Sequence, residues 1–310
     1  MIRKQDFSVS VIIPFVDNHE DVLQFKSRLD QQTYPKELTE IIFVDNGSKR
    51  NIAFPEEFLH DVIVIREFEN FNSPYSARNR GIEIAKGEVL VFVDANSRPD
   101  PDWLEKGLMC MKESGSEITA GDVQFYLGDS PPAAHIADAL TSIHMEKAVV
   151  ERGVAYTANL FIRKETMESV GFFEERTRSG GDVRWCMRAN EKGFRISFCK
   201  ESVVYKFPRS LKNLLIKKIR TGKGYFYTWK DETDKPIWFY NFFRSLKPPS
   251  LSKWNHDTMR KKAIDSGNRT KVRLILYMIG IVEQISFISE YLRYNLGSQR
   301  DIDRREEGCK

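Results

Sequence analysis

The chain has 310 residues, of which 48 are basic and 44 acidic, giving a formal net charge of +4. A chain of this length can bury one large core, with or without a small appendage, and 41% hydrophobic residues without an excess of Gly or Pro argue against disorder outside the ends. The charge is too small to indicate a nucleic-acid-binding protein, and we expect no nucleic-acid partner.

The first apolar run, residues 8–13, is predicted to be a buried strand. It follows a charged start, MIRKQDF, which is also how a signal peptide begins. No small-residue cleavage site follows, and Pro14 ends the run as it would end a strand. We therefore interpret the run as the first strand of the fold.

Strands and helical patterns alternate up to residue 113. Apolar runs at 41–44, 62–65 and 89–93 predict strands, and residues 20–32 and 101–113 show helical periodicity. Ser73-Pro74 opens another helix, to about residue 86, because Ser caps a helix and Pro suits its first position. Uniformly apolar strands alternating with helices predict an α/β fold, with a Rossmann-like, mostly parallel central sheet covered by helices on both faces.

The second half of the chain is mixed. Strands are predicted at 118–126, 156–162, 195–198 and 202–205, and a helix at 182–192. The chain is helical and basic from residue 211, and residues 230–270 receive no assignment. The run 206–223 has seven basic and no acidic side chains. It is either a solvated helix face or a surface that attracts a diphosphate, an anionic acceptor or a membrane.

Residues 271–296 predict a long apolar helix. One face of it carries the residues Leu274, Met278, Ile281, Ile285, Ile288 and Leu292. Its uninterrupted apolar stretch, 274–282, is shorter than the roughly 20 residues that span a membrane. We expect this face to pack on the domain or on a second copy of the chain, with docking on a membrane surface as the alternative.

The four cysteines, Cys110, Cys186, Cys199 and Cys309, include no CxxC pair, and no His lies at metal-ligand spacing from them. This pattern predicts free thiols rather than a disulfide framework or a zinc site. Free thiols are typical of a reducing cytoplasm, and we expect a cytoplasmic protein or one peripheral to the inner membrane face.

Polar residues follow three of the predicted parallel strands. The strands end in Pro14-Phe15-Val16-Asp17, in Asp45-Asn46-Gly47-Ser48 and in Asp94-Ala95-Asn96. Each could simply form a turn. Ligands of open parallel sheets, however, bind at the carboxyl ends of the strands, and three such ends together favour one shared site.

Four stretches resemble, in order and spacing, the motif series of the family-2 glycosyltransferases. They are SVSVIIPFVDN, IIFVDNGS, YSARNRGIEIAKGEVLVFVDAN and SVGFFEERTRSGGDVRWCMRANEKGFRI. The resemblance covers about residues 8–225. Members of that family are inverting enzymes with a GT-A fold, so it implies a GT-A domain over 1–225, followed by a mostly helical C-terminal extension over 226–310.

The resemblance implies a role in donor binding for each matching strand-end residue. Pro14, Phe15 and Asp17 would line the nucleoside pocket, with Phe15 near the base. Asp45 would bind the base or the ribose, and Arg78 the base or the diphosphate side of the donor.

The triplet Asp94-Ala95-Asn96 stands at the family's DxD positions, which hold the ribose and a divalent metal. The resemblance therefore implies Mg²⁺ or Mn²⁺ bound through Asp94, Asn96 and the donor diphosphate. Two departures weaken that site. Asn96 replaces the usual second Asp, and its neutral oxygen binds a hard cation less strongly than a carboxylate. Lys206 stands where the family commonly has His, so the alternative is that its ammonium does part of the metal's work.

Asp182 stands where the family places the catalytic base, and Trp185, three residues on, would form the floor of an acceptor-sugar site. A base must take the proton of the attacking hydroxyl, and the two glycines before Asp182 leave room for a close approach. An Asp at this point could also be an N-cap of the helix, or serve both purposes.

These features together predict an inverting hexosyltransferase. It would move a sugar from a nucleoside-diphosphate sugar to a glycan, lipid-linked or polymer acceptor in polysaccharide or cell-envelope biosynthesis. A non-catalytic nucleotide-sugar or glycan-binding partner is one alternative, since Asn96 and Lys206 depart from the pattern. A nucleotidyltransferase of similar layout is another, although PFVDNHED after the first strand lacks a Gly-rich phosphate loop.

Overall fold

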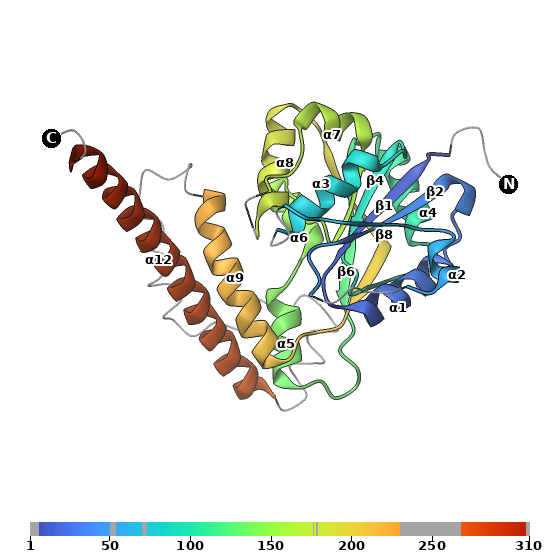
Figure 1. The fold of residues 1–310 in the computed structure, drawn as a ribbon. Helices are drawn as coiled ribbons and strands as arrows, with labels where there is room; N and C mark the ends of the chain where they lie inside the picture. Colours follow the sequence, from blue (N-terminus) through green and yellow to red (C-terminus); the bar gives the residue numbers. More distant parts are fainter. Residues whose placement is uncertain are drawn as a thin grey trace. The chain divides into compact units, whose positions relative to one another are not determined.

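The structure is a computed structural model that describes residues 6–49, 54–69, 73–175, 177, 179–229 and 268–307 (Figure 1). The chain forms two compact units. Unit 1 comprises Met1–Tyr126 and Ile143–Phe207, and unit 2 comprises Leu127–Ser142 and Pro208–Lys310. The domain boundary expected at residue 225 stays a prediction, and residues 230–267, most of the segment without an assignment, lie outside the described residues.

Unit 1 is built on one sheet in the order β3-β2-β1-β4-β7-β6-β8-β5. The strands are β1 (Val9–Phe15), β2 (Thr39–Asp45), β3 (Ile63–Arg66), β4 (Val89–Val93), β5 (Ser97–Pro99), β6 (Ile118–Phe125), β7 (Asn159–Arg163) and β8 (Ile196–Lys206). Strands β3, β2, β1 and β4 pair in parallel, β7 is antiparallel to both of its neighbours, and β6 pairs in parallel with β8. The parallel half matches the alternating pattern of the sequence.

The helices of unit 1 connect these strands. They are α1 (His19–Leu29), the 3₁₀ turn η1 (Lys36–Leu38), α2 (Glu56–Leu59), α3 (Pro74–Ile84), α4 (Trp103–Ser114), α6 (Met145–Arg152), α7 (Lys164–Val170) and α8 (Gly181–Glu191). The cap expected for α3 is confirmed, because Ser73 Oγ accepts hydrogen bonds from the backbone amides of Tyr75 and Ser76. Five uniformly buried residues make β4 the centre of the core.

Strand β8 differs from the expected pair of short strands. It is one strand, and its register against β6 shifts where Gly121 pairs with Cys199 and Asp122 pairs with Val203. The sequence pattern broke at this point because the residues between Cys199 and Val203 have no partners in the ladder. The strand resumes and ends at Lys206, next to the end of β4.

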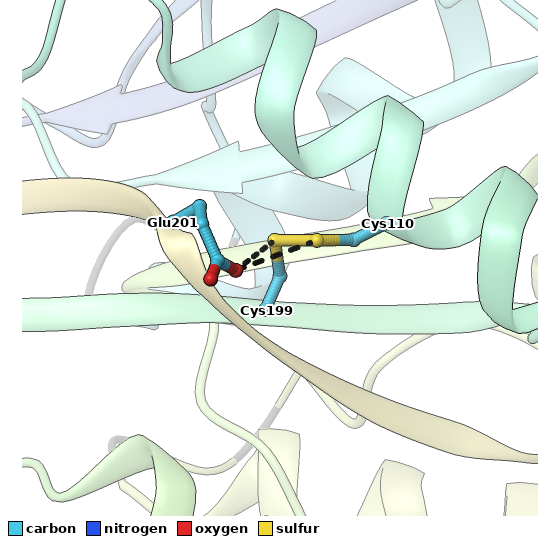
Figure 2. Close-up of side chains that lie close together, drawn as sticks. All are labelled: Cys110, Cys199 and Glu201. Atoms are coloured by element: carbon cyan, nitrogen blue, oxygen red, sulfur yellow. Dashed lines mark hydrogen bonds between the residues drawn. A yellow bond between two sulfur atoms is a disulfide. The ribbon is translucent and has the colours of Figure 1, made fainter.

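The expectation that all cysteines are free was wrong. Cys110 of α4 and Cys199 of β8 form a disulfide with an S–S distance of 2.04 Å, beside the Glu201 carboxylate (Figure 2). Sequence spacing gave no sign of it, since 89 residues separate the two. Cys186 is free and buried, as expected, and Cys309 lies outside the described residues. The disulfide removes the argument from free thiols for a reducing compartment.

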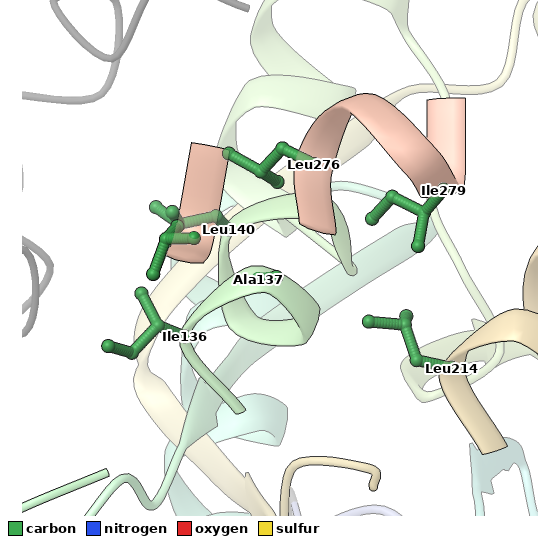
Figure 3. Close-up of a cluster of buried hydrophobic side chains, with 7 residues drawn as sticks. Ile136, Ala137, Leu140, Leu214, Leu276 and Ile279 are labelled. Carbon is green, nitrogen blue, oxygen red and sulfur yellow. The ribbon is translucent and has the colours of Figure 1, made fainter. Parts of the chain in front are cut away.

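Unit 2 contains the helices α5 (Ala133–Thr141), α9 (Leu211–Trp229) and α12 (Arg269–Glu307). Helices α9 and α12 lie side by side and run in the same direction (Figure 1). Their core is a cluster of aliphatic side chains shared with α5 (Figure 3). Asp138 of α5 is fully buried and pairs with Arg209 and Lys217. Burial alone would raise the pKa of Asp138, but these two cations lower it.

Reduction of the Cys110–Cys199 disulfide should destabilise unit 1. Closing an 89-residue loop restricts the unfolded chain, and such a bond contributes roughly 2–4 kcal/mol. Urea unfolding of a Cys309→Ser protein, followed by circular dichroism, should shift to lower urea when a phosphine reductant is added. The Cys110→Ser/Cys199→Ser variant should have the unfolding midpoint of the reduced protein, and adding the reductant should not change that midpoint. An unchanged midpoint on reduction would contradict the bond.

Candidate functional site

The carboxyl ends of β1 and β2 lie side by side, as the strand-end pattern predicted, and hydrogen bonds join the loops that follow them. Phe15 pairs with Asp45 in the sheet register. Beyond the strands, the Asp17 amide donates to Ser48 Oγ at 2.9 Å, and the Lys49 amide donates to Asp17 Oδ1 at 2.9 Å. Asp17 adopts a φ of 53°, a left-handed conformation that Asp tolerates better than most residues. The two loops therefore form one polar edge of the sheet.

The Asp45 carboxylate is buried and satisfied from two sides. Its Oδ1 accepts the Ser48 amide at 2.8 Å, and its Oδ2 lies 3.6 Å from Arg66 Nε at the end of β3. Phe15, expected near the nucleotide base, is only 3% exposed, and its ring packs edge-on against Phe43 and Phe54. Phe15 thus supports the edge from within the core.

Asp94, at the end of β4, receives two cations. Its Oδ1 accepts from Arg78 Nη2 at 2.9 Å, and its Oδ2 pairs closely with Lys206 Nζ. Arg78 and Lys206 are each 4% exposed, whereas a third of the Asp94 side chain reaches solvent. The triad brings together three predicted site residues from α3, β4 and β8. Its net charge is +1, so it favours an anionic ligand at its open side.

Arg78 also carries a buried donor without a partner. Its Nη1 donates to the Pro74 carbonyl at 3.2 Å, but Nε has no hydrogen-bond partner among the described residues. An unsatisfied buried donor costs about 1–3 kcal/mol, so natural structures seldom keep one without a function. A bound acceptor such as a phosphate oxygen would remove that cost.

These residues fit a divalent cation poorly. The one carboxylate of the triplet, Asp94, already has a cation on each oxygen. Ala95 is buried and offers no side-chain ligand, and Asn96 is exposed and neutral. A doubly charged ion would have to enter beside Arg78 and Lys206 against their positive charge. One other group in the described part of the chain has metal-ligand spacing, Cys110, Cys199 and Glu201, and there the sulfurs are bonded to each other.

Asp182 lies in the first turn of α8, where its carboxylate is buried and oriented. Oδ1 accepts from the Tyr75 hydroxyl at 3.1 Å and from the Val183 amide at 3.0 Å. Oδ2 accepts from the Thr157 amide at 3.2 Å and from Thr157 Oγ1 at 3.4 Å. The N-cap is Gly180, so the alternative of Asp182 as the cap residue is wrong. The helix dipole favours its negative charge at this position.

Tyr75 connects the two halves of the site. Its hydroxyl donates to Asp182, and the Arg78 guanidinium carbon lies 5.6 Å from the centre of its ring. Burial and the charge of Asp182 raise the pKa of Tyr75, so its hydroxyl stays a donor. A Cβ at Gly181 would lie 2.8 Å from Tyr75 Cε2, and Gly is needed there for α8 to approach.

Trp185 does not occupy the acceptor position expected for it. The indole is 0% exposed, its Nε1 donates to the Gly171 carbonyl at 2.7 Å, and its ring packs against Phe173. A helix position three residues after Asp182 shares its face, but that face continues into the core below the first turn. Trp185 therefore supports α8 and is unavailable to a sugar.

Sequence reasoning missed Tyr75 and Thr157. Tyr75 lies three residues before Arg78 on a predicted helix, a spacing that places both on one face, so it could have been found. Thr157 precedes β7 and meets Asp182 across 25 residues of chain, a contact with no local signal.

Comparisons with known proteins identify the family of the chain. The model of glycosyl transferase family 2 matches residues 10–173. Glycosyltransferase AglE of Haloferax volcanii is 35% identical over 224 residues, which are 71% of this chain and 74% of that protein. A poly(ribitol-phosphate) beta-glucosyltransferase of Bacillus spizizenii is 26% identical over 196 residues, which are 61% of this chain but only 30% of that protein.

Solved structures show the same fold. The mannosyltransferase PcManGT of Pyrobaculum calidifontis, in complex with GDP-Man and Mn²⁺, has a TM-score of 0.60 at 14% identity, covering 92% of this chain and 88% of that one. TarS of S. aureus in complex with UDP-GlcNAc has a TM-score of 0.52 at 15% identity, covering 94% and 92%. The GT-A fold expected from the sequence is thereby confirmed.

The Tyr75–Asp182 hydrogen bond should contribute measurably to stability. Tyr75→Phe removes a neutral donor to a buried carboxylate and should lower the free energy of unfolding by roughly 1.5–3 kcal/mol. Urea unfolding measures this. Tyr156→Phe is the control, because its hydroxyl lies 3.5 Å from Arg152 and should cost much less. If the two variants are equally stable, Asp182 is not held by Tyr75.

Proposed function

Because the chain belongs to glycosyl transferase family 2, we propose that it is an inverting hexosyltransferase that uses a nucleoside-diphosphate sugar. The acceptor we propose is a glycan, a lipid-linked sugar or a polymer of the cell envelope. Two observations support these classes. The structural neighbours hold GDP-Man or UDP-GlcNAc, and a curated relative is named as acting on poly(ribitol-phosphate).

The observation that carries the proposal is the continuous network from Asp182 through Tyr75 and Arg78 to Asp94 and Lys206. It holds a carboxylate at one end and two buried cations at the other. Displacing a nucleoside diphosphate from an anomeric carbon needs both, a base for the acceptor proton and positive charge for the leaving group.

In the proposed reaction, the acceptor hydroxyl oxygen attacks the anomeric carbon on the side opposite the diphosphate. The bond from that carbon to the phosphate oxygen breaks, and its electron pair leaves with the nucleoside diphosphate. Asp182 takes the hydroxyl proton. Its Oδ2 contacts to Thr157, at 3.2 and 3.4 Å, are long enough for an acceptor hydroxyl to replace one of them.

At the donor end, we assign charge neutralisation to Arg78 and Lys206. Without ligand, both are paired with the single carboxylate of Asp94, which leaves one positive charge. A diphosphate would supply the acceptor that Arg78 Nε lacks, and the ammonium of Lys206 would offset the charge that builds on the leaving group. We assign nucleotide binding to the edge formed by Asp17 and Asp45.

Asp182→Asn should abolish transfer and leave donor affinity nearly unchanged. The amide has almost the same shape but cannot take a proton, and general-base catalysis contributes about 10²- to 10⁴-fold in rate. Turnover is followed by release of nucleoside diphosphate and donor affinity by calorimetry, with the melting temperature confirming the fold. Glu191→Gln, at the far end of the same helix, is the matched control. A folded Asp182→Asn protein with near-normal turnover would refute the assignment.

Transfer should persist in excess EDTA, because Lys206 and Arg78 provide the positive charge that a metal would otherwise supply. Lys206→Ala should lose turnover by at least about 10²-fold, the scale of losing one electrostatic donor to a developing charge. Lys26→Ala is the control, since Lys26 is also buried and paired with an aspartate, Asp30. Loss of all activity in EDTA, restored by Mn²⁺, would disprove metal-independent transfer even if Lys206 matters.

A further inference from the structure

Helix α12 is apolar on two opposite faces, and the described residues of unit 2 cover one of them. The covered face places Val272, Leu276 and Ile279 in the core of unit 2. Figure 3 shows Leu276 and Ile279 directed toward Leu214 of α9 and the side chains of α5. This contact accounts for the packing of the helix within its own unit.

The other face, here called the outer stripe, consists of Leu274, Met278, Ile281, Ile285, Ile288 and Leu292. At 100° per residue these six fall within an arc of about 80° on the side opposite Leu276. Leu274 is 63% exposed, Ile285 56% and Leu292 50%. Among the described residues of unit 2, the helix packs on α5 and α9 through its other face, so the expectation that the outer stripe packs on the domain is not met there.

Charge is absent from the outer stripe. Between Arg273 and Arg293 the helix has two acidic residues and no basic one, and both of them, Glu283 and Glu290, lie on the covered side. Glu283 accepts from Lys218 Nζ at 3.3 Å and from Thr221 Oγ1 at 2.7 Å of α9, and Glu290 is 7% exposed. The carboxylates are thereby kept inside the protein, while the outer side is left uncharged.

Exposed basic residues flank the stripe at each end. Arg269, Lys271 and Arg273 precede Leu274, and Arg293 follows Leu292. With about 1.5 Å per residue, the stripe between them is about 27 Å long. By length and composition Arg269–Asn295 could cross a membrane, yet α9 packs along its inner face, and the Gly222 position of α9 lies close against the Glu283 backbone. This packing favours a helix that lies along a surface.

We propose that the outer stripe docks on an anionic lipid bilayer, with its aliphatic side chains in the acyl layer and its basic ends on the headgroups. A stripe of large aliphatic residues with cations at its ends is complementary to such a surface. A second copy of the chain fits less well. Pairing two stripes, parallel or antiparallel, brings basic ends next to basic ends, and like charges repel. The proposal does not depend on the proposed transfer reaction.

Flotation of the full-length protein with vesicles tests this docking. The protein should float with vesicles that contain phosphatidylglycerol, much less with pure phosphatidylcholine, and less again at high salt. The variant Leu274→Glu/Ile285→Glu/Leu292→Glu should lose at least about tenfold in partitioning, since each substitution places a charge in the acyl layer. The control Phe68→Glu/Val150→Glu changes two exposed apolar residues of unit 1 and should float like the unchanged protein.

Four outcomes would overturn the proposal. The first is flotation of the triple variant equal to that of the unchanged protein, and the second is no flotation of the unchanged protein. The third is that, in sedimentation without lipid, the unchanged protein is a dimer and the triple variant is a monomer. The stripe would then bind a second copy of the chain. The melting temperature of the triple variant should stay unchanged, and a large drop would show that the stripe belongs to a core.

Discussion

Two buried cations share one carboxylate at the end of the central strand, and the geometry of the candidate site depends on this triad. Arg78 and Lys206 are each 4% exposed, and their burial would cost several kcal/mol without Asp94 between them, because each would then be an unpaired buried charge. The triad also fixes three elements of distant sequence, α3, β4 and β8, at one edge of the sheet. The net positive charge of the site thus follows from the packing of α3 and β8 against the end of β4 in unit 1.

The remaining half of the site follows from α3. This helix begins at a capped Ser73, which sets the direction of its first two turns and so the faces of Tyr75 and Arg78. Arg78 pairs with Asp94, and Tyr75 donates to Asp182. A neutral phenol between a guanidinium and a carboxylate keeps the two charges apart while holding both in place. The positive and negative ends therefore remain distinct, as a reaction that separates a proton from a leaving anion requires.

The sequence was informative where function depends on local pattern. Strand ends, the Ser73 cap and the alternation of strands with helices are encoded within a few residues, and each could be predicted. Contacts across long stretches of chain could not. The Cys110–Cys199 bond spans 89 residues, the Thr157–Asp182 contact spans 25, and the shift in β8 is visible only against β6. Lys206 and Asp94, 112 residues apart, were expected at one site only because of the family resemblance. Trp185 shows a limit of helical periodicity, which predicts the helix face on which a side chain lies but not how deeply that side chain is buried.

Ion pairing, and not apolar burial, determines which face of α12 packs against α9. Both faces of this helix carry aliphatic side chains, so packing either face against α9 would bury a similar apolar area. Glu283 makes the two orientations unequal, because its carboxylate accepts hydrogen bonds from Lys218 and Thr221 in only one of them. Reversing the helix would expose Leu276 and Ile279 in place of Leu274 and Ile285, a nearly neutral exchange, but would also break a buried ion pair. The polar contacts inside unit 2 thus determine which apolar surface the protein presents outside.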